Sequence, residues 1–310
     1  MKKSIVLLFA GQGAQEVGMG HSLFEAYPRV REIIAKADDE LGVELSRIMF
    51  NGPSDELTQT SWCQPALYVH GLACWEILKE NCSSVNPVAA AGLSLGEFTA
   101  YSATGSFSFS DGLKLVAKRG KFMDEACAMT DGSMAAIIGG NEESVRELAD
   151  KYDVDVANLN APGQIVISGS RDKILCAAND VKNFGCRMGK VLEVAGAYHS
   201  RLMQSAQEKL AKELENFGII LPSCPVISNV EAEPIMQIDS IRSSLERQVT
   251  GSVRWSDSME FLLDSFPEAT FVEFSPKPVL AGLMSRIRRD VEVLTVTDPE
   301  SLEEAITALS

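Results

Sequence analysis

The chain has 310 residues, of which 45% are hydrophobic and 23% are charged, and its formal net charge is −15. This composition is typical of a soluble globular protein with a large core, or a core plus an inserted domain. The acidic balance argues against nucleic acid or an anionic membrane as a partner, and no run of 18 apolar residues predicts a membrane span.

The first predicted element is a buried strand over residues 5–9, which ends in the loop Ala10-Gly11-Gln12-Gly13. The glycines beside Gln12 allow backbone N–H groups to point outward at the strand end, as an oxyanion hole requires. A phosphate-binding loop is the alternative, but the G-K-[ST] of a P-loop and the spacing G-x-G-x-x-G are both missing. Helices are predicted next, over 22–36 and 65–80.

A candidate nucleophile follows the predicted strand 88–91, in Gly92-Leu93-Ser94-Leu95-Gly96. This is G-x-S-x-G between a strand and a helix predicted from Phe98 to Thr104, a setting that exposes the serine hydroxyl on a sharp turn. The alternative is a tight turn in which the glycines serve packing and the serine caps the helix. A serine needs a base to take its proton, so the prediction depends on a histidine elsewhere.

Three histidines are available. His70 lies in an apolar helical run and is predicted to be packed, whereas His21 is predicted at the surface or at a helix cap. His199 lies between a strand predicted over 189–194 and a helix predicted to begin near Ser200. A loop at a strand end gives a base access to a site, so His199 is the candidate base; a helix cap is the alternative.

Arg119 lies on a helical pattern of apolar residues around 113–123. Such a charge usually belongs to a solvated helix face. An arginine facing a serine nucleophile would instead pair with a carboxylate on the substrate. The spacing alone leaves both interpretations open.

Residues 132–194 predict a separate unit, with elements in the order β-α-β-β-α-β that is typical of a ferredoxin-like fold. The predicted elements are strands 133–138, 154–158, 164–168 and 189–194 and helices 142–152 and 171–184. We therefore expect a small subdomain at 129–196 inserted into a large α/β subdomain at 1–128 and 197–310. Since Ser94 and His199 flank the insertion, the site is expected in the cleft between the two.

The C-terminal part completes the α/β pattern of the large subdomain. Its predicted elements are helices 201–216, 239–248, 256–264 and 278–288 and strands 225–228 and 270–274.

The seven cysteines show no C-x-x-C and no metal-ligand spacing. They predict reduced cysteines in a cytoplasmic protein without a metal site. The start of the chain, Met1-Lys2-Lys3 and the apolar run after it, is too short for a signal peptide.

Taken together, these motifs resemble the malonyl-CoA:acyl-carrier-protein transacylase family, over nearly the whole chain. The resemblance implies an α/β-hydrolase-like large subdomain with a parallel sheet and a ferredoxin-like insertion. The matching segments are Phe9 to Gln15, Gln64 to Leu67, Gly92 to Glu97, Arg119-Gly120, Asn160 to Gly169, Ala197 to Ser200, Ser228 to Val230 and Val253 to Trp255.

The resemblance also implies roles for individual residues. Ser94 would be the acyl-accepting nucleophile and His199 its base, with the backbone N–H groups of Gln12 and Leu95 as the oxyanion hole. Arg119 would hold the free carboxylate of malonate.

Four further positions complete the implied site. Asn160, Gln64 and Tyr198 would line the substrate pocket, and the backbone carbonyl of Gln248 would orient the histidine. Two residues depart from the usual family pattern: Leu93 replaces a histidine, and Tyr198, in the substrate pocket, replaces the phenylalanine common in malonyl-specific members. A buried tyrosine hydroxyl needs a partner, and its presence could alter the choice of acyl group.

The implied activity is transfer of malonyl from malonyl-CoA to the phosphopantetheine thiol of acyl carrier protein in fatty-acid biosynthesis, through a malonyl-serine and without a cofactor. Service to a polyketide synthase, acyl hydrolysis and a non-catalytic role in docking carrier proteins are the alternatives. We expect a monomer.

An acidic carrier protein would need a basic patch on this acidic chain. Three clusters are candidates, although each could be a solvated face: Lys114, Lys118 and Lys121; Lys182, Arg187 and Lys190; and Arg286, Arg288 and Arg289.

Overall fold

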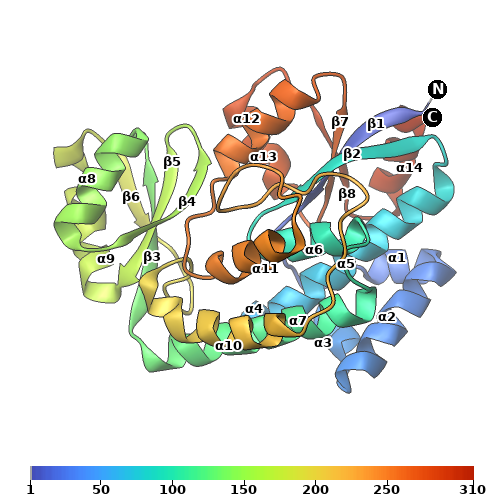
Figure 1. Ribbon diagram of the computed structural model, residues 1–310, viewed down its shortest axis with the longest axis horizontal. Coiled ribbons are helices and arrows are strands. Elements are labelled where there is room, and N and C mark those ends of the chain that lie inside the picture. The colour runs from blue at the N-terminus through green and yellow to red at the C-terminus, as the bar shows by residue number, and fades with distance from the viewer. Residues whose placement is uncertain (1) are drawn as a thin grey trace.

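The large part of the protein is built on a parallel four-stranded sheet in the order β2-β1-β7-β8 (Figure 1). The structure, a computed structural model, describes residues 2–310; Met1 lies outside the described residues. The strands are β1 (Lys3–Phe9), β2 (Val85–Gly92), β7 (Thr270–Phe274) and β8 (Val293–Val296). The central strand β1 is apolar on both faces and buried from Ile5 to Phe9, as a covered parallel strand requires.

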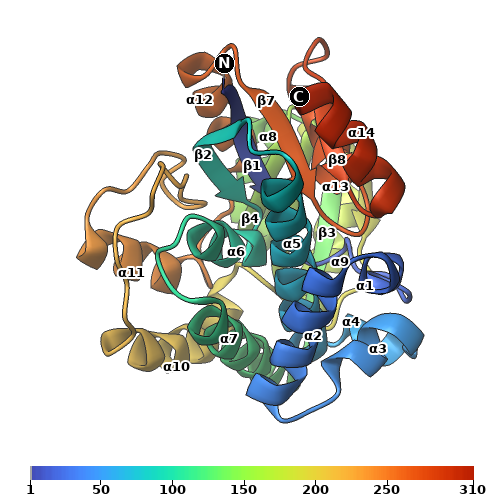
Figure 2. The ribbon, with the colours of Figure 1, turned by 90° about the vertical axis from the view of Figure 1, so that its right-hand side faces the viewer.

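Helices before and after β2 pack on this sheet and carry part of the site. Figure 2 shows α5 (Thr60–Asn81), α6 (Leu95–Ala103) and α7 (Phe109–Met129) lying beside one another below the strands. Helix α6 begins directly after β2 and packs against both β1 and β2. The carboxyl ends of β1 and β2 and the start of α6 therefore meet at one point.

The remaining helices surround this core. They are α1 (His21–Ala26), α2 (Pro28–Leu41), α3 (Leu45–Asn51), α4 (Ser54–Thr58), α10 (Gln204–Glu215), α11 (Ile238–Arg247), α12 (Trp255–Ser265), α13 (Val279–Ile287) and α14 (Pro299–Leu309).

The inserted part forms a separate antiparallel sheet in the order β4-β5-β3-β6, the left-hand lobe of Figure 1. This is the strand order of a ferredoxin-like unit, as the sequence predicts. It has a hydrophobic cluster of its own that includes Ala135, Ile167 and Cys186. We propose 129 and 196 as its limits. The elements are β3 (Gly132–Ile138), α8 (Glu142–Tyr152), β4 (Asp155–Ala161), β5 (Gln164–Ser170), α9 (Arg171–Asp180) and β6 (Met188–Val191).

Several predicted elements differ from the observed ones. The helix predicted over 22–36 is two helices, because Tyr27 is extended before Pro28 begins α2. The strand predicted over 225–228 is wrong: this segment makes only isolated bridges, Ala90 with Val226 and Ile227 with Pro234. The strand predicted over 189–194 ends at Val191, and β8 and α14 were not predicted.

The two ends of the described chain lie on the same side of the molecule (Figures 1 and 2). The ammonium of Lys3 donates to the carbonyl of Ala308 over 2.9 Å, which ties β1 to α14. Among the helices of residues 2–310, none combines the length and the apolar character needed to cross a bilayer.

Candidate active site

Ser94 lies in a sharp turn between β2 and α6, with φ 55° and ψ −109°. The two glycines of the turn are required by close packing. A Cβ at Gly92 would lie 1.9 Å from the carbonyl carbon of Gly96, and a Cβ at Gly96 would lie 2.1 Å from the carbonyl oxygen of Phe9. The turn that G-x-S-x-G predicts is therefore present, and it directs the serine away from the sheet.

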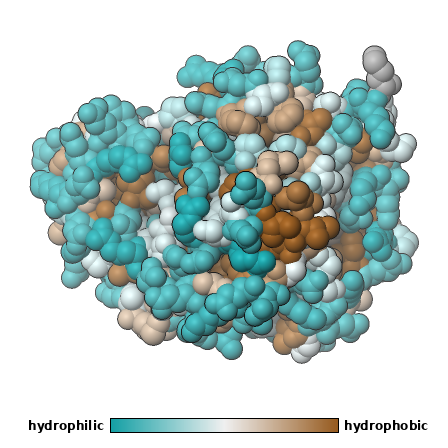
Figure 3. Space-filling view, viewed as in Figure 1, coloured by the Kyte–Doolittle hydropathy of each residue, from teal (hydrophilic) through white to brown (hydrophobic). Residues whose placement is uncertain are grey.

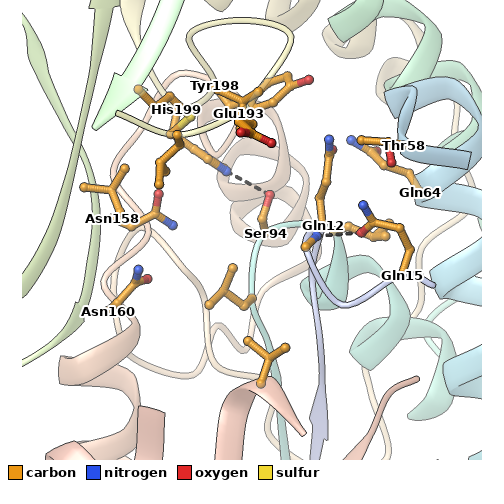
Figure 4. A pocket seen from close by; sticks show the side chains of 18 of the residues that line it. Gln12, Gln15, Thr58, Gln64, Ser94, Asn158, Asn160, Glu193, Tyr198 and His199 are labelled. Atoms are coloured by element: carbon orange, nitrogen blue, oxygen red, sulfur yellow. Dashed lines mark hydrogen bonds between the residues drawn. The ribbon is translucent and has the colours of Figure 1, made fainter. Parts of the chain in front are cut away.

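The hydroxyl of Ser94 is hydrogen-bonded to His199, with 2.8 Å between Oγ and Nε2 (Figure 4). The other ring nitrogen, Nδ1, lies 2.8 Å from the carbonyl oxygen of Gln248 and 3.2 Å from that of Gly251. Because a carbonyl can only accept, Nδ1 carries the hydrogen and Nε2 is free to take the serine proton. The two side chains that are 105 positions apart in sequence thus form a nucleophile–base pair.

His199 is kept neutral by its surroundings. The side chain is buried, and burial lowers the pKa of His199 to about 4, with a further lowering by the positive charge of Arg119. The carbonyls of Gln248 and Gly251 act in the opposite direction but do not outweigh burial. At neutral pH the imidazole is therefore available as a base.

Arg119 lies on α7, is buried, and points at the serine. Its Nη2 donates to Ser94 Oγ over 3.2 Å and to the side-chain oxygen of Gln248 over 2.8 Å, and its guanidinium lies 5.1 Å from the ring centroid of Phe98. The alternative of a solvated helix face is thus wrong. Nε and Nη1 have no hydrogen-bond partner within the described residues, so the guanidinium retains donors for a further acceptor.

Asn229 holds the strained turn in place. Its Oδ1 accepts from the backbone N–H of Ser94 over 2.6 Å, and its Nδ2 donates to the carbonyl of Gly92 over 2.7 Å. Sequence reasoning gave this residue no role, although the segment Ser228 to Val230 belongs to the resemblance. The only local signal for Asn229 in the sequence was an asparagine outside any predicted helix or strand.

A cavity of about 280 Å³ adjoins the serine. Figure 4 shows Asn158 and Asn160 on one side of Ser94 and Gln12 and Gln64 on the other. The Oε1 of Gln64 and the Oδ1 of Asn160 are buried without a hydrogen-bond partner in the described residues. Orphaned polar atoms of this kind are uncommon in a folded protein and are suited to contact a polar substrate.

Arg119 is not among the residues that line the cavity. Its Nη2 contacts Ser94, which does line the cavity. Gln12, Leu93, Leu95 and Tyr198 do line it.

The two expected oxyanion donors are unpaired in the described part of the chain. Neither the backbone N–H of Gln12 nor that of Leu95 has a protein acceptor. Leu95 is the first residue of α6, where an N–H has no partner within the helix. The N–H of Ser94 itself is occupied by Asn229 and is not available. An anion beside Ser94 would thus meet a helix N-terminus.

Tyr198 has its hydroxyl satisfied, 2.7 Å from the Oγ1 of Thr60, and it also interacts with the side chain of Gln12. The hydroxyl therefore links the loop that carries His199 to the start of α5. No group of three or more His, Cys, Asp or Glu side chains in residues 2–310 could hold a metal ion.

Known proteins share both the sequence and the fold. Residues 6–298 match the family model described as "Acyl transferase domain". The malonyl CoA-acyl carrier protein transacylase of Bacillus subtilis is 40% identical over 98% of this chain and 97% of its own length. A polyketide biosynthesis malonyl CoA-acyl carrier protein transacylase of the same organism, PksC, is also 40% identical, over 94% of this chain and 99% of its own length.

Among solved structures, the malonyl CoA-acyl carrier protein transacylase of Coxiella burnetii is 34% identical and covers 100% of this chain and 98% of its own, with a TM-score of 0.95. A second match comes from the structure of a type II polyketide synthase acyl-carrier protein in complex with its malonyl-transacylase. The matching chain is 34% identical, the match covers 99% of this chain and 100% of that chain, and the TM-score is 0.93. The chain therefore belongs to the malonyl-CoA:acyl-carrier-protein transacylase family.

Proposed function

We propose that this protein transfers malonyl from malonyl-CoA to the phosphopantetheine thiol of acyl carrier protein through a malonyl ester on Ser94. One observation carries the proposal: Ser94 Oγ lies 2.8 Å from a neutral imidazole and 3.2 Å from a buried guanidinium. The imidazole provides the base for attack on a thioester. The guanidinium provides a partner for a second, charged end of the acyl group.

In the first half-reaction His199 Nε2 takes the proton of Ser94, and Oγ attacks the thioester carbonyl. The negative oxygen that forms is stabilised by the backbone N–H groups of Gln12 and Leu95, each worth about 3 kcal/mol in comparable enzymes. The carbon–sulfur bond breaks, and His199 returns the proton to the sulfur of CoA. The product is an ester on Ser94.

In the second half-reaction the carrier protein's thiol takes the place of CoA. His199 removes the thiol proton, the sulfur attacks the ester carbonyl, and Ser94 leaves with the proton restored. CoA leaves before the carrier protein reacts with the ester on Ser94, so we expect ping-pong kinetics. The carbonyl of Gln248 holds the imidazole for both steps.

Arg119 supports malonyl as the acyl group. A malonyl ester on Ser94 carries a carboxylate close to its ester carbonyl, and the guanidinium of Arg119, whose Nη2 contacts Ser94, has two further donors, Nε and Nη1, without a partner in the described residues. Acetyl would leave these buried donors unsatisfied, at a cost of about 1–3 kcal/mol. Gln64 and Asn160 add acceptors for the remaining polar groups of the substrate.

Fatty-acid synthesis is the pathway that we favour. Service to a polyketide synthase is the alternative, because the polyketide biosynthesis transacylase PksC is as similar to this chain as the other Bacillus subtilis transacylase. We further propose a cytoplasmic monomer. Its cysteines support this setting, because all seven are free.

The test is to incubate the protein with malonyl-CoA and follow the mass of the peptide that contains Ser94, with and without holo acyl carrier protein. We expect a malonyl adduct that persists alone and disappears when the carrier protein is added, together with formation of malonyl-carrier protein. Rapid CoA release without a carrier protein would favour a hydrolase instead. An Arg119→Ala variant in the same assay should lose the preference for malonyl-CoA over acetyl-CoA.

A further inference from the structure

A buried carboxylate, Glu97, lies next to the site but has no part in the mechanism above. It is the third residue of α6 and is fully buried. Its Oε2 accepts hydrogen bonds from Nε2 of Gln248 over 2.6 Å and from the backbone N–H of Asn229 over 3.2 Å. Its Oε1 has no partner in the described residues. A carboxylate is costly to bury, and the hydrogen bonds of this one all involve Oε2.

The side chain of Gln248 connects Glu97 to Arg119. Its Nε2 donates both to Glu97 and to the carbonyl of Ser94, over 2.6 and 2.8 Å, and its Oε1 accepts from Nη2 of Arg119 over 2.8 Å. Two acceptors face the amide nitrogen and one donor faces the amide oxygen. Only one of the two flipped orientations of the carboxamide satisfies all three contacts.

Arg119 depends on this carboxamide for its position. In residues 2–310 no carboxylate oxygen lies within 4.0 Å of the guanidinium. Its hydrogen bonds are those to Ser94 Oγ and to Gln248 Oε1. If the carboxamide turned over, its NH₂ group would face the guanidinium, and two donors would oppose each other.

We propose that Glu97 is a positioning residue for acyl-group selection: it fixes the carboxamide of Gln248, which in turn fixes the guanidinium of Arg119 beside Ser94. This inference rests on the proposed function, since it concerns the choice between acyl groups with and without a free carboxylate. It adds a side-chain role to Gln248, whose backbone carbonyl holds His199.

The protonation of Glu97 shows which of its properties matters. Burial raises the pKa of Glu97 to about 7, against the opposing effects of Gln248, Asn229 and the charge of Arg119. The group therefore keeps its proton to higher pH than an ordinary glutamate does, and Oε1, which has no partner in the described residues, is the oxygen free to carry it. Its contribution is then an acceptor oxygen rather than a full negative charge, and glutamine can supply the same oxygen.

The test measures kcat/KM for transfer of malonyl and of acetyl from CoA to holo acyl carrier protein in Glu97→Met, Gln248→Met, the double variant and Glu97→Gln. In both single Met variants the malonyl value should fall about tenfold or more relative to the acetyl value. The double variant should lose no more preference than either single one, because both break the same link. Glu97→Gln should stay within about threefold of the wild-type preference.

Glu273 provides the matched control, because it is also a fully buried glutamate. It accepts from the backbone N–H groups of Val279, Leu280 and Ala281, far from this hydrogen-bond chain in sequence. Glu273→Met should lower stability without changing the malonyl-to-acetyl ratio. Should Glu97→Met fail to fold, Glu97→Asp is the substitute. Its side chain is one methylene shorter, so the acceptor oxygen moves away from Gln248, and the variant must show the same loss of preference.

Equal losses for malonyl and acetyl in the Glu97 variants, or additive losses in the double variant, would overturn the positioning role. Failure of the proposed function gives a different result, because the wild-type protein would then not transfer malonyl at all.

Discussion

At the scale of single residues, Ser94 lies between a neutral base and a fixed positive charge. The guanidinium of Arg119 favours a developing negative charge on the serine oxygen, and it also disfavours a proton on His199. The same side chain thus acts on the nucleophile and on the base, and in the proposed mechanism it also holds the acyl group.

The acidity of His199 gives a prediction at this scale. With a folded-state pKa of about 4, the imidazole becomes protonated only well below neutral pH. The kcat/KM for malonyl-CoA, which reports the free enzyme, should therefore hold as pH falls and reach its acid midpoint near pH 4. In Arg119→Ala one of the two lowering effects is lost, so the midpoint should move to higher pH. A wild-type midpoint near 6.5, the ordinary value for histidine, would contradict this.

At the scale of elements, the site depends on the junction of β1, β2 and α6. The strands bring the loop after Phe9 next to the turn at Ser94, and α6 begins in that turn. The segment around Asn229 then locks the junction, although it is not a strand. Local sequence predicted the strand, the turn and the helix, because glycine spacing and apolar runs are local signals. Local sequence could not predict the hydrogen bond between Ser94 and Asn229, because these residues are 135 positions apart.

Asn229 gives the prediction for this junction. In Asn229→Ala the N–H of Ser94 and the carbonyl of Gly92 lose their partners, so the free energy of unfolding should fall by about 2–4 kcal/mol. The rate of acyl-Ser94 formation should fall as well, because the strained backbone of Ser94 is no longer held. Urea denaturation and single-turnover mass spectrometry measure the two effects.

A second variant, Asn229→Asp, keeps the acceptor for Ser94 but buries a carboxylate oxygen against the carbonyl oxygen of Gly92, so its loss of stability should equal or exceed that of Asn229→Ala. Unchanged stability in both variants would show that the turn does not need Asn229.

At the scale of the whole molecule, the surface must admit an acidic carrier protein despite a net charge of −15. Figure 3 shows a face that is mostly hydrophilic, with its largest hydrophobic patch right of the centre. The three basic clusters differ in how many of their charges form ion pairs within the chain. Lys114 and Lys118 are paired with Glu40 and Glu213, both at 2.6 Å, and Arg288 lies 3.8 Å from Asp264.

The cluster Lys182, Arg187 and Lys190 has no carboxylate partner within 4.0 Å among residues 2–310. Lys190 and Val166 are both paired with Ala136 in the small sheet, so they share one face, and Val166 lines the cavity. The charge of Lys190 therefore lies on the cleft side of the insertion. This makes Lys190, with the cluster to which it belongs, the best candidate for contact with the carrier protein.

We predict that Lys182→Glu combined with Lys190→Glu raises KM for the carrier protein on the order of tenfold at low salt. Salt should weaken the effect, since the interaction is between exposed charges. Loading of Ser94 from malonyl-CoA is the reference measurement and should change less. The matched control is Lys121→Glu combined with Arg289→Glu, which reverses unpaired cations of the other two clusters. A larger effect in the control pair would assign the docking face elsewhere.

The sequence by itself determined the local chemistry of this protein: the glycine-bounded serine, the histidine at a strand end, the buried central strand and the inserted β-α-β-β-α-β unit. These depend on periodicity and on backbone geometry within a few residues, which any short segment carries. Only the tertiary structure decided which way Arg119 faces, which tautomer His199 adopts, and that Asn229, Glu97 and the side chain of Gln248 belong to the site. The reason is physical: a buried hydrogen bond is defined by both partners, and here the partners come from segments that meet only when the chain is folded.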